Sequence, residues 1–189
     1  MFKKEDYAIV LDFLPQGRAT EARREPVAQV IGEQYFTLLE VSVKPDAKLA
    51  PGDRVYIGRD ARDQVDHIRG RINSDGLTNG AQRELGPTIR KIILTREKEF
   101  VDFLNRAGAI NIRAHVLELL PGVGKKHLQD LVAERSKKPF ESFADVQTRV
   151  PHMIKAEELF VQRITEELKG GSKYYLFVKI PQGEREDRY

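Results

Sequence analysis

One short stretch has residues whose types and spacing could bind a phosphate group. It reads Leu119-Leu-Pro-Gly-Val-Gly-Lys-Lys126 and lies between two segments with helical hydrophobic spacing. Two glycines around one apolar residue, entered by proline, are typical of a tight turn that only glycine adopts without strain. The N–H groups of such a turn and of the next helix start lack helical partners, so they attract anions. The candidate phosphate contacts, which would read no bases, are Pro121, Gly122, Val123, Gly124, Lys125 and Lys126.

This stretch resembles the helix-hairpin-helix motif of nucleic-acid-binding proteins, although His127-Leu128 stands where that motif often has Thr-Ala. The resemblance implies that a Na⁺ or K⁺ ion would fit on the hairpin carbonyls. We expect no other cofactor. The stretch Arg149-Val-Pro-His-Met-Ile-Lys155 occupies the place of a second hairpin without glycines, so we expect it to pack and not to bind phosphate. In the plainest alternative, the glycines only provide the geometry of an ordinary helix connection.

An enzymatic alternative comes from DNA glycosylases that carry this hairpin. They place a catalytic Asp some way after it, and some use a hairpin Lys as nucleophile. Here Asp145 follows Gly124 by 21 positions, and Lys126 could take the place of the lysine. We favour structural roles, with Asp145 in a capping box that begins at Ser142. The helical region before the hairpin is also too short to hold a flipped base.

A second group of basic residues lies in the first part of the chain. Strand alternation would put His67, Arg69 and Arg71 on one exposed face, and the polar segment before Pro26 contains Arg23 and Arg24. Together with the aromatic residues Tyr35, Phe36 and Tyr56, they are candidate contacts for a nucleic-acid strand. The aromatic side chains could equally be core residues.

The elements that must position these residues change in character near residue 80. Before it, alternating apolar residues predict short strands in a small antiparallel barrel or sandwich. These strands are expected at 7–14, 27–31, 34–43, 54–58 and 65–72. After it, helical spacing predicts helices through 89–104, with Thr95 as an internal N-cap, and at 111–119, 124–135, from 142, and at 156–168. The run KYYLFVKI at 173–180 returns to β character, so we predict a strand over 173–181 that pairs with the N-terminal sheet.

Composition excludes several classes of protein. The chain has 189 residues, no cysteine and a net charge of +3, with 32% charged residues. Without cysteine there is no disulfide framework, no thiol nucleophile and no Cys-ligated metal. The four histidines show no metal-binding spacing. No apolar run could span a membrane and no signal peptide is evident, so we expect a cytoplasmic protein, and the dense, balanced charge is compatible with a thermophile.

Four segments in order resemble the archaeal DUF655 family of predicted nucleic-acid-binding proteins. They are Pro51-Gly-Asp-Arg-Val-Tyr-Ile-Gly58, Arg71-Ile-Asn-Ser-Asp-Gly-Leu-Thr78, Leu117-Glu-Leu-Leu-Pro-Gly-Val-Gly-Lys-Lys126 and Pro139-Phe-Glu-Ser-Phe-Ala-Asp-Val146. The resemblance implies an α+β protein with an OB-like β domain at 1–82, joined by strand 173–181. It also implies a tandem helix-hairpin-helix domain at 83–171, and the tail at 182–189 is expected to be disordered. The genes of that family often lie near ribosomal genes, which favours RNA and ribosome-associated factors as partners.

We therefore expect a non-catalytic protein that binds RNA or DNA mainly through the backbone. A protein–protein adaptor is the alternative, because tandem hairpin units and OB barrels also serve that role.

Overall fold

A computed structural model describes residues 4–19, 21 and 24–179 of the chain. Two compact units emerge from the contacts, one built from residues 1–88 with 166–189 and the other from residues 89–165. The expected disordered tail at 182–189 and Arg23 lie outside the described residues.

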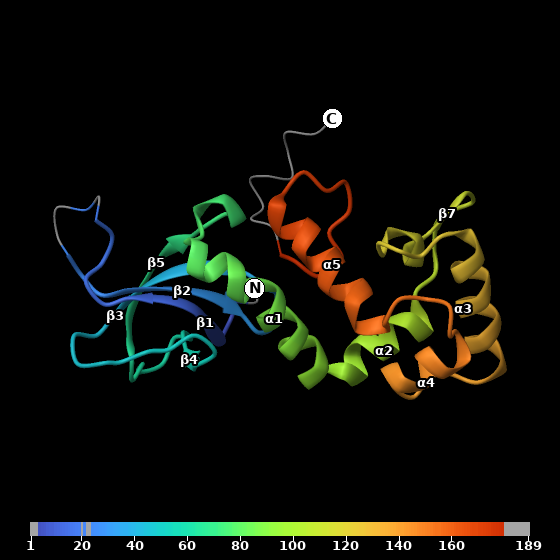
Figure 1. The fold of residues 1–189 in the computed structure, drawn as a ribbon, viewed down its shortest axis with the longest axis horizontal. Helices are drawn as coiled ribbons and strands as arrows, with labels where there is room; N and C mark the ends of the chain where they lie inside the picture. Colours follow the sequence, from blue (N-terminus) through green and yellow to red (C-terminus); the bar gives the residue numbers. More distant parts are fainter. Residues whose placement is uncertain (1–3, 20, 22–23, 180–189) are drawn as a thin grey trace. The chain divides into compact units, whose positions relative to one another are not determined.

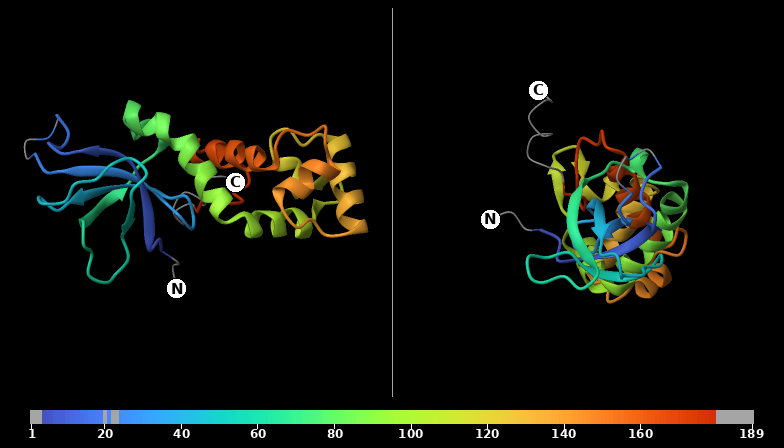
Figure 2. Two further views of the ribbon diagram at one scale, coloured as in Figure 1. Left: turned by 60° about the horizontal axis from the view of Figure 1, so that its bottom comes forward. Right: turned by 90° about the vertical axis from the view of Figure 1, so that its left-hand side faces the viewer.

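The first unit is built on a curled, five-stranded antiparallel sheet (Figures 1 and 2). Its strands are β1 (Tyr7–Leu14), β2 (Val27–Gly32), β3 (Leu38–Val43), β4 (Arg54–Tyr56) and β5 (Val65–Arg71), in the order β4-β1-β2-β3-β5. Alternation along the strands places Val10, Val30 and Val41 on one face, where they pack with Val55 and Val65 in a buried core. The α+β class and the antiparallel strands predicted from the sequence are confirmed.

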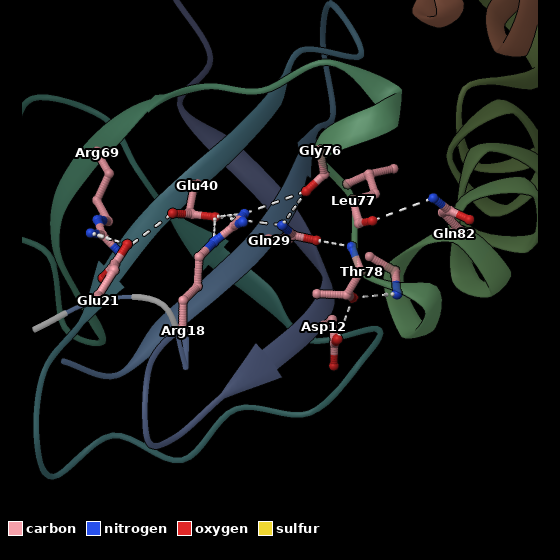
Figure 3. Close-up of polar contacts among 11 residues, drawn as sticks. Asp12, Arg18, Glu21, Gln29, Glu40, Arg69, Gly76, Leu77, Thr78 and Gln82 are labelled. Carbon is pink, nitrogen blue, oxygen red and sulfur yellow. Dashed lines mark hydrogen bonds and ion pairs between the residues drawn. The ribbon is translucent and has the colours of Figure 1, made fainter. Parts of the chain in front are cut away.

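Polar side chains occupy the other face of this sheet, and a short helical segment satisfies them (Figure 3). The fully buried Gln29 donates to the carbonyl of Gly76, in the 3₁₀ helix η1 (Ser74–Gly76), at 2.9 Å. Its amide oxygen accepts from the N–H of Thr78 at 2.8 Å. The Thr78 hydroxyl donates to Asp12 and accepts from Ala81 N–H, so it caps helix α1 (Asn79–Thr95).

The second unit is helical and is packed around phenylalanine rings. It contains the later part of α1, then α2 (Glu97–Arg106), α3 (Lys125–Lys137), α4 (Phe143–Arg149) and most of α5 (Ala156–Lys169). The ring of Phe160 lies 4.9 Å from that of Phe100 and 6.0 Å from that of Phe143, centroid to centroid. These rings come from three helices, so they join α2, α4 and α5 in one core.

The predicted helix over 111–119 is wrong. This segment forms a two-stranded hairpin of β6 (Ala109–Asn111) and β7 (Ala114–His115), followed by the 3₁₀ helix η2 (Val116–Leu119). The Asn111 side chain accepts from Arg113 N–H at 2.8 Å, and His115 Nδ1 accepts from Leu117 N–H at 3.1 Å. Such local side-chain bonds give the backbone an alternative to the helix. The predicted N-cap at Thr95 is also wrong, because Arg96 holds that position at the start of α2.

The predicted strand over 173–181 is wrong for residues 173–179, the part of it that the structure describes. The N–H groups of Leu176, Phe177 and Val178 donate to the buried carboxylate of Glu167, at 2.7, 3.0 and 2.8 Å. A side chain thus replaces the neighbouring strand as their acceptor. At the end of the segment, Lys179 N–H lies 3.4 Å from the carbonyl of Tyr35, in the turn between β2 and β3, and the Lys179 carbonyl accepts from Arg71 of β5 at 2.8 Å.

Glu5 holds another turn in the same way. Its carboxylate accepts from the N–H groups of Gln34, Tyr35 and Thr37, at 2.9, 2.8 and 3.3 Å. The turn contains Phe36, which is buried and has a φ of 53°. No helix among the described residues has the length and apolarity needed to cross a bilayer.

Candidate nucleic-acid interface

The hairpin between η2 and α3 has the left-handed turn that its sequence predicts at Gly122, but not at Gly124. Gly122 has a φ of 91°, in the left-handed region, and Val123 N–H donates to the Leu120 carbonyl at 3.0 Å. Leu120 and Val123 are both buried, so the turn is anchored by its apolar residues. Gly124 is extended, with a φ of −82°, and caps the start of α3. The hairpin is therefore a fixed turn that ends directly in a helix N-terminus.

Several backbone N–H groups at this turn are available to a ligand. The N–H groups of Gly124, Lys125 and Lys126 donate to no group in the part of the chain that the structure describes. Gly124 is exposed, and a β-carbon built on it would meet no atom within 4 Å. The N-terminus of the 13-residue helix α3 thus presents donors and the positive end of its dipole toward open space.

The lysines at this helix start differ from the basic residues at its other end. Lys125 and Lys126 are exposed and have no ion-pair partner among the described side chains. At the end of α3, by contrast, Glu134 pairs with both Lys137 and Arg149. Lys138 pairs with Glu141 at 2.9 Å. The positive charges of Lys125 and Lys126 are therefore available to bind an external anion.

Two hairpin carbonyls that could bind Na⁺ or K⁺ already accept hydrogen bonds. The Leu120 carbonyl accepts from Val123, and the Gly122 carbonyl accepts from His127 Nδ1 at 3.0 Å. These bonds leave fewer free lone pairs for a cation. No group of three or more His, Asp or Glu side chains suited to a metal ion occurs within residues 4–19, 21 and 24–179.

The second hairpin repeats the apolar anchors of the first without its left-handed turn. Val150 and Met153 are buried in the places of Leu120 and Val123, and Met153 N–H lies 3.4 Å from the Val150 carbonyl. His152, in the place of Gly122, does not have a positive φ. The backbone of this turn therefore follows a different path from that of the first hairpin.

The two hairpin glycines should respond differently to alanine. At Gly122, a β-carbon would need a left-handed backbone and would lie 3.2 Å from Ile154 Cδ1, so Gly122→Ala should cost roughly 1–3 kcal/mol of stability. At Gly124 the backbone suits any residue, so Gly124→Ala should cost below about 1 kcal/mol, the loss of a helix cap. Urea unfolding of both variants measures the difference, and a larger cost at Gly124 would contradict the turn geometry.

His115 lies beside this site and has a titratable nitrogen that caps η2. Burial, with a smaller effect from Arg135, lowers the pKa of His115 below its usual 6.5. The neutral Nδ1 accepts the Leu117 N–H, and the Glu118 carboxylate accepts the His115 N–H, so together they cap η2. Protonation of Nδ1 removes the first bond.

Stability should therefore fall as the pH drops below about 6.5, because the unfolded chain then binds more protons than the folded one. In His115→Asn, asparagine keeps a capping acceptor but does not titrate. The parent should lose stability relative to this variant between about pH 7.5 and pH 5, as measured by urea midpoints. Parallel pH profiles of the two proteins would show that this cap is not pH-sensitive.

The predicted basic residues of the sheet are engaged within their own unit (Figure 3). Arg69 contacts Glu21 at 2.8 Å and Glu40 at 3.4 Å, and the bond to Glu21 raises the pKa of Arg69. Arg71 donates to the carbonyl of Lys179 at 2.8 Å. Arg24 is exposed, whereas Arg23 is not described. Of the aromatic candidates, Phe36 is a core residue and Tyr35 and Tyr56 are half-buried.

Asp145 is held in contacts that stabilise the start of α4. Its carboxylate accepts from Glu141 N–H at 3.0 Å and from Arg149 at 3.2 Å, and these bonds lower the pKa of Asp145. Its own N–H donates to Ser142 Oγ at 3.0 Å. The predicted N-cap at Ser142 is confirmed, but the second bond of the predicted capping box is replaced, because the Asp145 carboxylate accepts from the Glu141 N–H and not from that of Ser142.

One exposed element beside the hairpin was missed by sequence reasoning. Ile112, at the turn between β6 and β7, is 98% exposed, and Arg113 follows it. The wrong helix prediction over 111–119 concealed this turn, although the Asn-Ile-Arg-Ala sequence has a turn-forming asparagine.

Comparison with known proteins agrees with the resemblance seen in the sequence. A family model described as "Protein of unknown function (DUF655)" matches residues 4–179. The uncharacterized protein MJ0038 of Methanocaldococcus jannaschii is 40% identical over 183 residues, which are 96% of this chain and 83% of that protein. The crystal structure of Af1531 from Archaeoglobus fulgidus is similar with a TM-score of 0.88 and 48% identity, covering 93% of this chain and 100% of that one. These matches confirm the predicted resemblance, and the chain belongs to the DUF655 family.

Proposed function

We propose that this protein binds the phosphate backbone of a nucleic acid through the hairpin at 120–126, without catalysing a reaction. The observation that carries the proposal is the start of α3. Unbonded N–H groups of Gly124, Lys125 and Lys126 lie together there, and the two lysine side chains have no ion-pair partner among the described residues. Donors and positive charge at one helix N-terminus suit a phosphate oxygen.

The surrounding elements support a tandem helix-hairpin-helix arrangement in which the 3₁₀ helix η2 takes the place of the first helix of the first motif. Each hairpin has a buried apolar residue before its proline and another two positions after it. Arg163 of α5 donates to the Leu119 carbonyl at 3.1 Å, which ties the helix after the second hairpin to the end of η2. The second hairpin thus braces the first.

The sheet supports an OB-like fold in its first four strands. The order β4-β1-β2-β3 is that of a Greek key, which OB barrels contain. Because Arg69 and Arg71 are bonded within this unit, we assign the main phosphate contact to the hairpin and only a supporting contact to the sheet.

The contacts of Asp145, the candidate catalytic residue of the glycosylase alternative, support a role without catalysis. The Asp145 carboxylate is used by Glu141 N–H and Arg149, so it is not poised to activate a nucleophile. Binding through backbone phosphates also predicts weak dependence on base sequence.

Fluorescence anisotropy with short labelled RNA and DNA, single-stranded and double-stranded, tests the proposal. Binding should weaken steeply between about 50 and 200 mM salt, because bound phosphates release counterions. Two unrelated sequences of the same form should bind alike. The RNA and DNA arms decide which polymer is preferred. Absence of binding at low salt to all four forms would overturn the proposal and favour the protein–protein adaptor.

A further inference from the structure

An exposed isoleucine lies at the tip of the β6–β7 hairpin, close to the proposed phosphate site. Ile112 is 98% exposed, while the other exposed large apolar side chains among the described residues are 36% to 49% exposed. Fully exposing an isoleucine leaves its whole apolar surface in water. The β6–β7 hairpin that carries Ile112 leads directly toward the hairpin at 120–126.

The hairpin holds this tip in a fixed place. Arg113 N–H donates to Asn111 Oδ1 at 2.8 Å across the turn, and Val116 N–H donates to the Gly108 carbonyl at 2.9 Å at its base. The His115–Glu118 capping box then joins β7 to η2, which leads directly into the phosphate-binding turn. Ile112 is therefore presented by ordered backbone.

A groove of about 330 Å³ separates this hairpin from the first turns of α3, and β7 and α3 are neighbours in Figure 1. Ile112, Arg113 and His115 line one side, and Lys125, Leu128 and Gln129 line the other. Arg113 and Lys125 are both exposed and have no ion-pair partner among the described residues. Glu118 also lines the groove, but its carboxylate accepts the His115 N–H. The groove thus combines two cationic groups, one carboxylate and one exposed apolar tip.

We propose that Ile112 inserts beside an unstacked base while the hairpin at 120–126 holds a neighbouring phosphate. The preferred ligand is then a duplex with an opened step, such as a bulge, and not a regular duplex. Apolar side chains, isoleucine included, insert between base steps in this way, and steps that are already opened cost least to unstack. This inference rests on the proposed function, because the phosphate contact places the base near Ile112.

The test compares a regular duplex with the same duplex carrying a one-base bulge, in RNA and in DNA. A 2-aminopurine next to the bulge reports unstacking by its fluorescence. The parent should bind the bulged form about tenfold more tightly, an effect of the size that burial of one isoleucine side chain provides. Binding of the parent to the bulged duplex should raise the 2-aminopurine fluorescence. Ile112→Ser should lose both effects but bind the regular duplex as the parent does.

Ile112 and Arg113, the two residues of the turn between β6 and β7, do not have a positive φ. Serine therefore fits the backbone at position 112 without strain. Leu94→Ser is the matched control, since Leu94 is 49% exposed in the same unit. It should keep the preference for the bulge. Equal binding of both duplexes by the parent, or an unchanged preference in Ile112→Ser, would overturn this inference alone. Failure of the parent to bind either duplex, while it still binds single strands, would likewise overturn this inference alone. Failure to bind single strands and duplexes alike at low salt would overturn the proposed function as well.

Discussion

Replacing Lys125 and Lys126 together with glutamate is expected to weaken nucleic-acid binding by about 10- to 100-fold at moderate salt. The two lysines flank the unbonded N–H groups of the α3 N-terminus. The double variant removes two phosphate partners and places carboxylates where a phosphate would bind. It should also flatten the salt dependence, by a slope of about 1 for each phosphate contact that is lost. Anisotropy titrations over a range of salt concentrations measure both effects.

A matched control separates this local effect from total charge. Lys91→Glu with Lys98→Glu makes the same change in net charge on exposed lysines of the same unit, in helices α1 and α2, where Lys98 pairs with Asp102 at 3.2 Å. We expect it to bind within about threefold of the parent, because charges beyond a Debye length are largely screened. Equal losses in the two double variants would contradict a hairpin site, whereas equal melting temperatures would exclude unfolding as the cause.

Glu167→Gln is expected to lower the free energy of unfolding by roughly 3 kcal/mol, which is a fall of about 6–12 °C in the melting temperature. The Glu167 side chain is almost fully buried and accepts three backbone N–H groups from residues 176–178. Glutamine keeps the volume but removes the charge and directs an NH₂ group at N–H donors. Because the segment at 173–179 would lose its anchor, it should also become sensitive to limited proteolysis.

Glu166→Gln is the neighbouring control. Glu166 is exposed, and no bond from its side chain occurs among the described residues. Its replacement should change the melting temperature by less than about 2 °C, as is usual for surface substitutions. Thermal melting and protease digestion of both variants are the measurements. If Glu167→Gln were as stable as Glu166→Gln, the buried carboxylate would not be what holds the segment.

The parts of the fold that follow local rules could be predicted from the sequence. Leu39, Val41 and Val43 alternate with Glu40 and Ser42, and this pattern indicated a strand with one face in the core. Ser142 caps α4 through Asp145 N–H, as its spacing indicates. The left-handed glycine at 122 and the helix start at 125 also follow from local chemistry. In each case, residues within one turn or one strand decide the structure.

The parts that failed depend on partners distant in the chain or on competing local bonds. Arg69 has the alternation of an exposed basic face, but its partner Glu21 is 48 residues away, in the loop before β2. The run KYYLFVKI has strong β propensity, yet Glu167 takes its N–H groups. At 111–119, apolar spacing suits a helix, but the side chains of Asn111 and His115 bond the backbone into a hairpin and a 3₁₀ turn. No periodicity in the sequence encodes these choices.

The two edge strands of the sheet have features that disfavour self-association through the sheet. In the described part of the chain, β4 and β5 are the outer strands, and either could pair with a strand of another copy. β4 has only three residues, and β5 carries Asp66, His67, Arg69 and Arg71 as exposed side chains. Short and charged edges discourage such pairing. Arg69 and Arg71, predicted as nucleic-acid contacts, are thus charged residues of an outer strand, where charge disfavours pairing with a second copy even beside the exposed Ile68.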